Sequence, residues 1–255
     1  LGSKVTVVEV MDRILPVEDA EISSFAQNVF EKQGMSFHVG AEVQSLKPTK
    51  HGIIASIKGQ KDKVITLEFE KVILAVGITG NVENIGLEGS KIEVEKGHLK
   101  VNQWMQTDEP GVYAIGDLVG PPWLAHKASH EAVLCIERIA GIEETLPLDT
   151  DNVPACTYCR PQIASIGMTE EVALAKGQKV RVGRFPFRGN GKAIALGAPE
   201  GFIKTVFDAS SGELLGAHMV GAEVTELIQG FAVAKTLETT EADLLRTIFP
   251  HPTLS

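Results

Sequence analysis

The sequence lacks any apolar run long enough to cross a lipid bilayer, and no basic segment followed by an apolar one stands near its start. A membrane-spanning helix needs about 20 apolar residues, and a secretory signal needs both of those segments. Basic residues are also outnumbered, with 24 Lys and Arg against 33 Asp and Glu, so the net charge is -9. A surface of that sign repels nucleic acid and anionic lipid. We therefore expect neither a membrane nor a nucleic acid as a partner.

Cysteine is scarce, and the chain does not open with methionine. Cys135, Cys156 and Cys159 are the only cysteines among 255 residues, too few for a disulfide scaffold. We expect a reducing compartment, either the cytoplasm or, in a eukaryote, the mitochondrial matrix. Leu1 stands immediately before an apolar strand pattern, so we expect the sequence to be a fragment that lacks an N-terminal part.

The chain is organised around the stretch Val112-Tyr-Ala-Ile-Gly-Asp117, which continues through a Gly-Pro-Pro loop into a helical pattern at residues 125–140. The first four residues predict a strand. A strand, a glycine, an acid, a loop and a helix in that order are typical of a ligand site at the carboxyl end of a strand. Gly116 would let a ligand approach the backbone, Asp117 would accept hydrogen bonds from a polyol, and the helix would offer free N–H groups. The spacing equally fits an ordinary turn with a solvated Asp117.

The start of the chain predicts part of a nucleotide-binding unit. Val5-Thr-Val-Val-Glu-Val10 is a nearly continuous apolar run, as in parallel strands that are buried on both faces. Glu9 lies where a dinucleotide-binding unit places the carboxylate that binds ribose hydroxyls. The Gly-rich turn that precedes such a carboxylate is absent from the sequence, and a strand-end acid in water is the alternative. An amphipathic helix follows at residues 18–33, with Gly34 as its C-cap.

The rest of the chain predicts short strands and then two helices. Gly77 closes one apolar strand pattern, either for close backbone approach to a ligand or simply to turn the chain. A polar, proline-containing segment at residues 143–153 marks a domain boundary. Beyond it we expect an antiparallel sheet with helices on one side, an α+β domain. The predicted strands are 42–46, 53–57, 64–69, 72–76, 163–167, 180–187, 193–196, 202–207 and 214–220, and the two helices are 224–237 and 241–248.

Two further features could carry chemistry. Cys156-Thr-Tyr-Cys159 has redox or zinc spacing, but redox pairs usually open a helix and a closed zinc site needs four ligands, so we expect a structural role and no metal. His251 lies between Pro250 and Pro252, which fix its backbone and suit it to act as a general base near neutral pH. No orienting acid follows it in the sequence, so a loop histidine is the alternative.

Several of these stretches together resemble the flavin-dependent pyridine-nucleotide–disulfide oxidoreductases. The ending His251-Pro-Thr-Leu-Ser255 and the segment Ala125-His-Lys-Ala128 most resemble the dihydrolipoamide dehydrogenase branch of that family. The resemblance implies the C-terminal part of an NAD-binding domain at residues 1–77, a central domain that contacts FAD at 78–148, and an interface domain at 149–255. The implied fold class is α/β, with a partial Rossmann-like NAD domain plus the central domain, followed by an α+β dimerisation domain with an antiparallel sheet.

The resemblance also implies roles for single residues. Glu9 would bind the adenosine ribose of NAD, Val43 would line the adenine side, and Gly77 would touch the nucleotide through its backbone. Asp117 would bind the ribityl chain of FAD. His251 would be the base that handles the dithiol proton at the flavin site of the other subunit. The residues implied to lie against the flavin are Trp123, Leu124, Ala125 and His126.

The implied function is oxidation of protein-bound dihydrolipoamide, with electrons passing through FAD to NAD⁺. The implied partners are a second copy, in a homodimer, and the lipoyl domains of 2-oxoacid dehydrogenase complexes. Glu9 favours NAD over NADP because it would repel a 2′-phosphate. Another disulfide reductase or a transhydrogenase of the same family is the alternative. The redox cysteine pair and both Gly-rich turns of the family are missing, so the isolated chain is expected to be inactive and could serve only as a dimerisation module.

Overall fold

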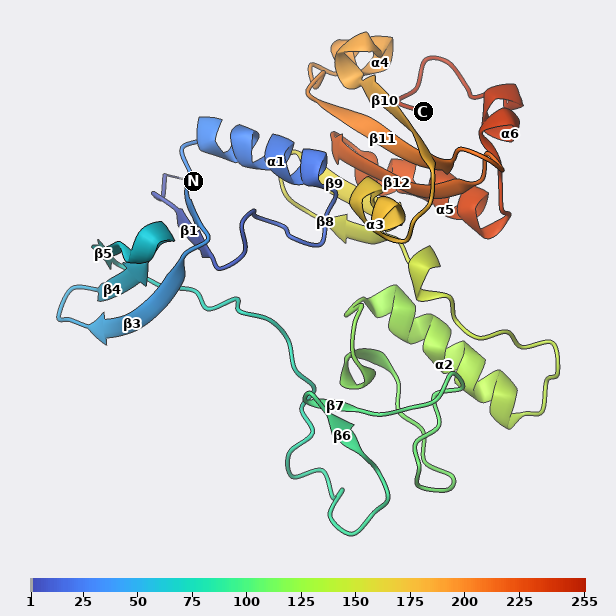
Figure 1. Cartoon of the computed structure of the whole chain (residues 1–255), viewed down its shortest axis with the longest axis horizontal. Coiled ribbons are helices and arrows are strands. Elements are labelled where there is room, and N and C mark those ends of the chain that lie inside the picture. Colours follow the sequence, from blue (N-terminus) through green and yellow to red (C-terminus); the bar gives the residue numbers. More distant parts are fainter. Residues whose placement is uncertain (1) are drawn as a thin grey trace. The chain divides into compact units, whose positions relative to one another are not determined.

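The computed structural model describes residues 2–255 and divides into two compact units (Figure 1). The sheet unit contains the chain up to Ile73 together with Pro154–Ser255, and the α2 unit contains Leu74–Val153. The predicted division into three domains, with boundaries after residues 77 and 148, stays a prediction, because two predicted domains can pack into one compact unit. Across residues 2–255, no helix is both long and apolar enough to cross a membrane.

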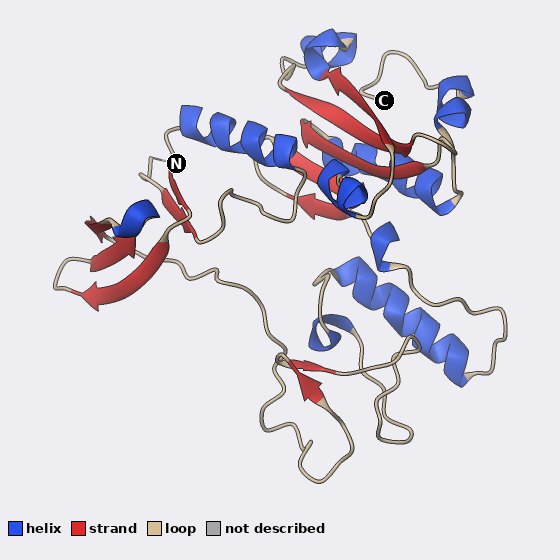
Figure 2. Ribbon diagram, in the orientation of Figure 1, coloured by secondary structure: helices blue, strands red, loops and turns tan. Residues whose placement is uncertain are grey.

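A five-stranded antiparallel sheet forms the core of the sheet unit, in the order β10-β11-β12-β9-β8 (Figure 2). Side chains alternate between the faces of a strand. Ala217 and Met219 of β12 therefore pack with helix α5, while Val220 packs with helix α1. Every residue of β12 is buried. The strands are β8 Ala155–Thr157, β9 Gln162–Gly167, β10 Val180–Pro186, β11 Gly201–Asp208 and β12 Leu214–Gly221.

Helices cover both faces of this sheet, whereas the sequence predicted them on one side. Helix α1, from the start of the chain, supplies the second cover: Ile22 and Ala26 are fully buried against Ile163 and Val220. Only the folded chain brings residues 20–32 to a sheet made of residues 155–221, so the local pattern could not predict this layer. The longer helices of the unit are α1 Ala20–Lys32 and α5 Val224–Thr236, and the short ones are α3 Glu170–Ala175, α4 Gly191–Ala195 and α6 Glu241–Arg246.

A buried lysine ties the start of α1 to the sheet. Lys204 of β11 is 2% exposed, and its Nζ lies 2.9 Å from Oδ2 of Asp19, the N-cap of α1. The same Nζ lies 2.7 Å from Glu21 and 2.8 Å from Glu170. A buried cation is tolerated only where it is paired and hydrogen-bonded, and three carboxylates meet that need here.

The first 70 residues add two small sheets to the sheet unit. Strand β1 pairs in parallel with β2, as the apolar run at the start of the chain predicted. Strands β3, β4 and β5 form an antiparallel sheet, and the three predictions there are confirmed. Ala41, Ala55 and Ile57 are buried on its inner side. The strands are β1 Thr6–Glu9, β2 Ser36–Val39, β3 Glu42–Pro48, β4 Ile53–Lys58 and β5 Val64–Phe69, and the single-turn helix η1 is Gln60–Asp62.

The α2 unit consists of loops around one long helix. Helix α2 spans Ala125–Ile139, which confirms the predicted helix, and it buries Leu134 and Cys135 against Met105. The remaining elements of this unit are the hairpin strands β6 Val94–Glu95 and β7 His98–Leu99, and the single-turn helices η2 Gly116–Val119 and η3 Thr150–Asn152. One further single-turn helix, η4 Phe187–Gly189, belongs to the sheet unit. With these elements the predicted fold class, a mixed α/β part followed by an α+β part with an antiparallel sheet, is confirmed.

Three strand predictions are wrong. Residues 72–76 form no regular structure, and Ile73 and Val76 are 89% and 93% exposed. A buried parallel strand needs neighbours, and the described residues place none beside this segment. Val112–Ile115 makes only one bridge, from Tyr113 to Gln106. Residues 193–196 lie largely in α4, because the side chain of Asn190 accepts the N–H of Ala193 and starts a helical turn.

Candidate functional site

The segment around Asp117 forms a tight turn packed onto the start of α2. Gly116 has φ +76°, and a Cβ at this position would lie 3.4 Å from the Cβ of Ala128. This left-handed conformation and close approach favour glycine. Asp117 is exposed at the start of η2. The turn therefore presents one carboxylate beside the first turn of a helix, as the sequence predicted.

A buried ion pair holds this turn in place. Lys127 and Glu131 lie one turn apart on α2, with side chains 2% and 4% exposed and a Nζ–Oε1 distance of 2.9 Å. Glu131 Oε2 accepts the N–H of Gly116 at 2.7 Å. Lys127 Nζ donates to the carbonyl oxygens of Gly116 and Gly120, at 3.3 and 2.9 Å. The pair thus binds both ends of the turn that carries Asp117.

The N-terminus of α2 is suited to an anionic or strongly polar ligand group. Leu124 is the N-cap and provides no side-chain hydrogen bond, and the first turn contains no acidic residue. The first N–H groups of a helix lack intrahelical acceptors, and the helix dipole adds partial positive charge there. Asp117 provides an exposed carboxylate, and Gly116 has no Cβ that would block a ligand. The N-terminus of α2 has no side-chain cap. These three features fit the predicted FAD contacts of Asp117 and residues 123–126.

Trp123 is fixed by a second aromatic ring. Its indole Nε1 donates to Nε2 of His98 at 3.2 Å. The two rings are stacked, with centroids 5.8 Å apart and an angle of 30° between their planes. His98 lies on β7, 25 residues earlier in the chain, so no local pattern indicated this pair.

Two of the three predicted NAD contacts, Glu9 and Val43, lie near one end of the β1–β2 pair. Oε1 of Glu9 accepts the N–H of Met11 at 2.8 Å, which orients the carboxylate and leaves Oε2 for a ligand hydroxyl. The carbonyl of Glu9 accepts the N–H of Ala41 at 3.0 Å. Val43, two residues further on, is 41% exposed on β3. The structure therefore brings Glu9 and Val43 together, and their roles toward the nucleotide stay predictions.

Gly77 and His251 are exposed in separate segments. Gly77 has φ +122° in the irregular segment that enters the α2 unit. His251 lies near the end of the chain, in a segment anchored by Asn190, whose amide donates to the carbonyl of Thr253 at 3.2 Å. Leu254 packs against the apolar core that β12 and α5 share. The backbone that follows the exposed imidazole of His251 is therefore held in place.

Three residues that shape the site were not predicted from the sequence: His98, Lys127 and Glu131. Lys127 and Glu131 have the i, i+4 spacing of a helical ion pair, and that spacing was the available signal. Nothing in the sequence indicated that both side chains would be buried against the backbone of Gly116.

The Cys156-x-x-Cys159 stretch lies in a different environment from a redox centre. Both cysteines are free, and burial raises the pKa of each thiol above its usual value. Redox-active thiols have lowered pKa values. Within residues 2–255, no group of three His, Cys, Asp or Glu side chains is arranged to hold a metal ion.

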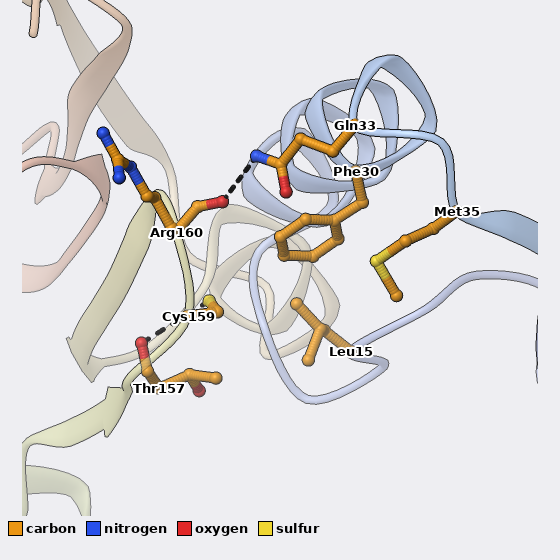
Figure 3. A pocket seen from close by; sticks show the side chains of 7 residues that line it. All are labelled: Leu15, Phe30, Gln33, Met35, Thr157, Cys159 and Arg160. Carbon is orange, nitrogen blue, oxygen red and sulfur yellow. Dashed lines mark hydrogen bonds between the residues drawn. The ribbon is translucent and has the colours of Figure 1, made fainter. Parts of the chain in front are cut away.

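Cys159 lines an open hollow of about 410 Å³ between α1 and β8. Figure 3 shows Phe30 and Leu15 on one side of it and Arg160 on the other, where the side chain of Gln33 donates to the carbonyl of Arg160 at 2.8 Å. The Sγ of Cys159 donates to a carbonyl 3.0 Å away, that of Pro161. The Cys159 thiol therefore already donates a hydrogen bond to the protein backbone.

Two family models match the chain. The model for pyridine nucleotide-disulphide oxidoreductases matches residues 1–132, and the model for the dimerisation domain of the same family matches residues 153–255.

Curated relatives and solved structures agree with these matches. The chain is 53% identical over 254 residues to a dihydrolipoyl dehydrogenase from Zymomonas mobilis and 52% identical over 255 residues to one from Rhizobium etli. It spans about half the length of these relatives, 54% and 53%, while its own length is fully covered. It is similar in structure to LpdA from Mycobacterium tuberculosis, with a TM-score of 0.88 and 28% identity over 99% of this chain and 54% of that one. The fold is also that of the Escherichia coli flavoprotein disulfide reductase RclA, with a TM-score of 0.90 and 22% identity over 99% of this chain and 56% of that one.

Proposed function

The chain belongs to the pyridine nucleotide-disulphide oxidoreductase family, and we propose that it forms the C-terminal part of the NAD-binding domain, the central domain and the interface domain of a dihydrolipoyl dehydrogenase. The proposal is supported by relatives of that name at 53% and 52% identity across the whole chain. The single structural observation that carries it is the Asp117 turn, held at the uncapped N-terminus of α2 by a buried ion pair.

The proposed reaction oxidises protein-bound dihydrolipoamide to lipoamide and reduces NAD⁺. Bound FAD would supply the two-electron redox chemistry between the dithiol and the nucleotide. Asp117 would hold bound FAD by accepting hydrogen bonds from the ribityl hydroxyls, and Glu9 would hold NAD by accepting them from the adenosine ribose. His251 takes a proton from the dithiol. The same proposal includes the lipoyl domains of 2-oxoacid dehydrogenase complexes as substrate carriers and the cytoplasm as the compartment.

Replacing Asp117 by alanine in the full-length protein should release FAD more readily, because a ribityl hydroxyl loses its acceptor. The measurement is the visible flavin spectrum of parent and variant before and after dialysis. Asp108→Ala is the matched control, since it removes another exposed acid from the same unit. A parent without bound flavin would overturn the proposed function. An Asp117→Ala variant that keeps its flavin as the parent does would make Asp117 a turn residue only.

Replacing Glu9 by alanine should weaken NAD binding and narrow its advantage over NADP. The expected loss is on the order of 1.5–3 kcal/mol, the usual contribution of hydrogen bonds to a charged group. Titration calorimetry of the full-length protein with both nucleotides measures it, with Glu70→Ala as the control for charge alone. Unchanged NAD affinity in Glu9→Ala would remove this carboxylate from the site.

The full-length protein should be a homodimer, as the name of the family model for residues 153–255 suggests. Helix α5 has an apolar stripe, but its residues Ile228 and Ala234 are buried in the core of the sheet unit. Leu245 and Ile248, 81% and 95% exposed, are better candidates for the interface.

We expect Leu245→Asp with Ile248→Asp to shift sedimentation at micromolar concentration from dimer to monomer, since each apolar side chain contributes about 1.5–3 kcal/mol when it is fully buried. Leu146→Asp, at an 80% exposed position in the other unit, is the control. A monomeric parent would contradict the homodimer, and a dimeric double variant would move the interface elsewhere.

A further inference from the structure

The imidazole of His98 lies at the meeting point of three backbone segments of the α2 unit. It sits at the end of the β6–β7 hairpin and stacks on the indole of Trp123. A Cβ built on Gly120 would lie 3.9 Å from the ring. The neighbouring Gly97 accepts the N–H of Gly80 through its carbonyl, at 2.8 Å. The hairpin therefore contacts both the loop that follows Gly77 and the turn that follows Asp117.

The hydrogen bonds of His98 define one tautomer. Trp123 Nε1 is a donor only, so Nε2 of His98 must accept from it at 3.2 Å. Nδ1 lies 3.1 Å from the carbonyl oxygen of Lys96 and must carry the proton. The imidazole of His98 thus donates to the carbonyl of Lys96 through Nδ1 and accepts from the indole of Trp123 through Nε2.

Trp123 lies in the segment between Gly120 and the N-cap of α2. Lys127 binds the carbonyl of Gly120 at one end of the segment, and no side chain caps α2 at the other end, where Leu124 is the N-cap. Pro121 and Pro122 between them have no N–H to donate. The bond to His98 is therefore a side-chain contact that restrains the entry into α2.

We propose that His98 is a positioning residue, which fixes the indole of Trp123 and through it the residues that lead into the N-terminus of α2. The inference rests on the proposed function, because residues 123–126 are the segment proposed to lie against the flavin. His98 itself acts only through Trp123.

The test uses the full-length protein with ¹⁵N-labelled tryptophan. His98→Phe keeps an aromatic ring but removes the acceptor, His98→Gln keeps an acceptor, and Trp123→Phe removes the donor. We expect the Nε1–H of Trp123 to exchange with solvent roughly 2- to 12-fold faster in His98→Phe than in the parent, the range that one net hydrogen bond allows. His98→Gln should stay closer to the parent.

Flavin release gives the second readout. FAD dissociation should quicken by a similar factor in His98→Phe and in Trp123→Phe, and the double variant should add nothing further, because both remove the same bond. If His98→Phe does not fold, faster release in Trp123→Phe with parental release in His98→Gln still supports the proposal, and any other pattern overturns it.

The two proposals fail in different ways. A parent that binds no flavin overturns the proposed function, while indole exchange still reports on the His98 bond in the flavin-free protein. A flavin-bound parent whose His98→Phe variant matches it in both indole exchange and FAD release overturns the role of His98.

Discussion

Replacing His251 by glutamine in the full-length enzyme should slow the reduction of bound flavin by dihydrolipoamide by roughly 10²–10⁴-fold, the usual contribution of a general base. The thiolate, not the thiol, attacks a disulfide, so the dithiol must lose a proton first. A neutral imidazole accepts that proton near physiological pH. Glutamine has a similar polarity but cannot take up a proton, so flavin should stay bound while the reaction slows.

The structure holds the backbone around this imidazole. Asn190 donates to the carbonyl of Thr253, and Leu254 packs on the core, so the backbone that follows His251 is held. The hydroxyl of Thr253 also donates to the carbonyl of Pro250 at 2.6 Å. The chain thus closes a short turn around an exposed side chain.

Stopped-flow measurement at equal flavin content compares the parent with His251→Gln. His51→Gln is the matched control, because it removes an exposed histidine of the same unit that has no proposed role. A variant that reduces its flavin at the parental rate would make His251 a structural histidine between two prolines.

The sequence predicted the elements whose pattern is local. The apolar spacing of α1, α2 and α5 and the alternation in β3, β4 and β5 follow from side-chain direction within one element. Residues 72–76 show where this reasoning fails, because an apolar run becomes a strand only when other strands pair with it. Helix α5 shows a second limit of such patterns: Ile228 and Ala234 are apolar because they fill the protein's own core.

The candidate site was predictable in its exposed parts only. Gly116 and Asp117 belong to one short motif, so the sequence alone indicated a turn with a carboxylate. The residues that hold the turn lie further along the chain: Glu131 binds the N–H of Gly116 across 15 positions, and His98 binds Trp123 across 25. Such contacts depend on the folded chain, and a single sequence carries no measure of them.

The buried pair leads to the second large prediction. Replacing Lys127 by methionine should lower the free energy of unfolding by about 3–5 kcal/mol, because it leaves the carboxylate of Glu131 buried without its cation. Methionine keeps much of the lysine volume, so the cost arises from the charge rather than from a cavity. The carbonyl of Gly120 also loses its donor. The turn that carries Asp117 should loosen together with the fold.

Urea unfolding of the full-length protein, followed by tryptophan fluorescence, reports on this unit, because both tryptophans of the chain, Trp104 and Trp123, lie in it. Lys100→Met is the matched control: Lys100 forms an ion pair with Glu93 at 2.7 Å, but both side chains are more than half exposed, and such pairs contribute little. The double variant Lys127→Met with Glu131→Gln separates charge from hydrogen bonding. Its amide oxygen can still accept the N–H of Gly116, and no charge remains buried, so it should be more stable than Lys127→Met alone. If Lys127→Met costs no more than Lys100→Met, the pair does not hold the turn, and the position of Asp117 must be set by the packing of Gly116 against Ala128.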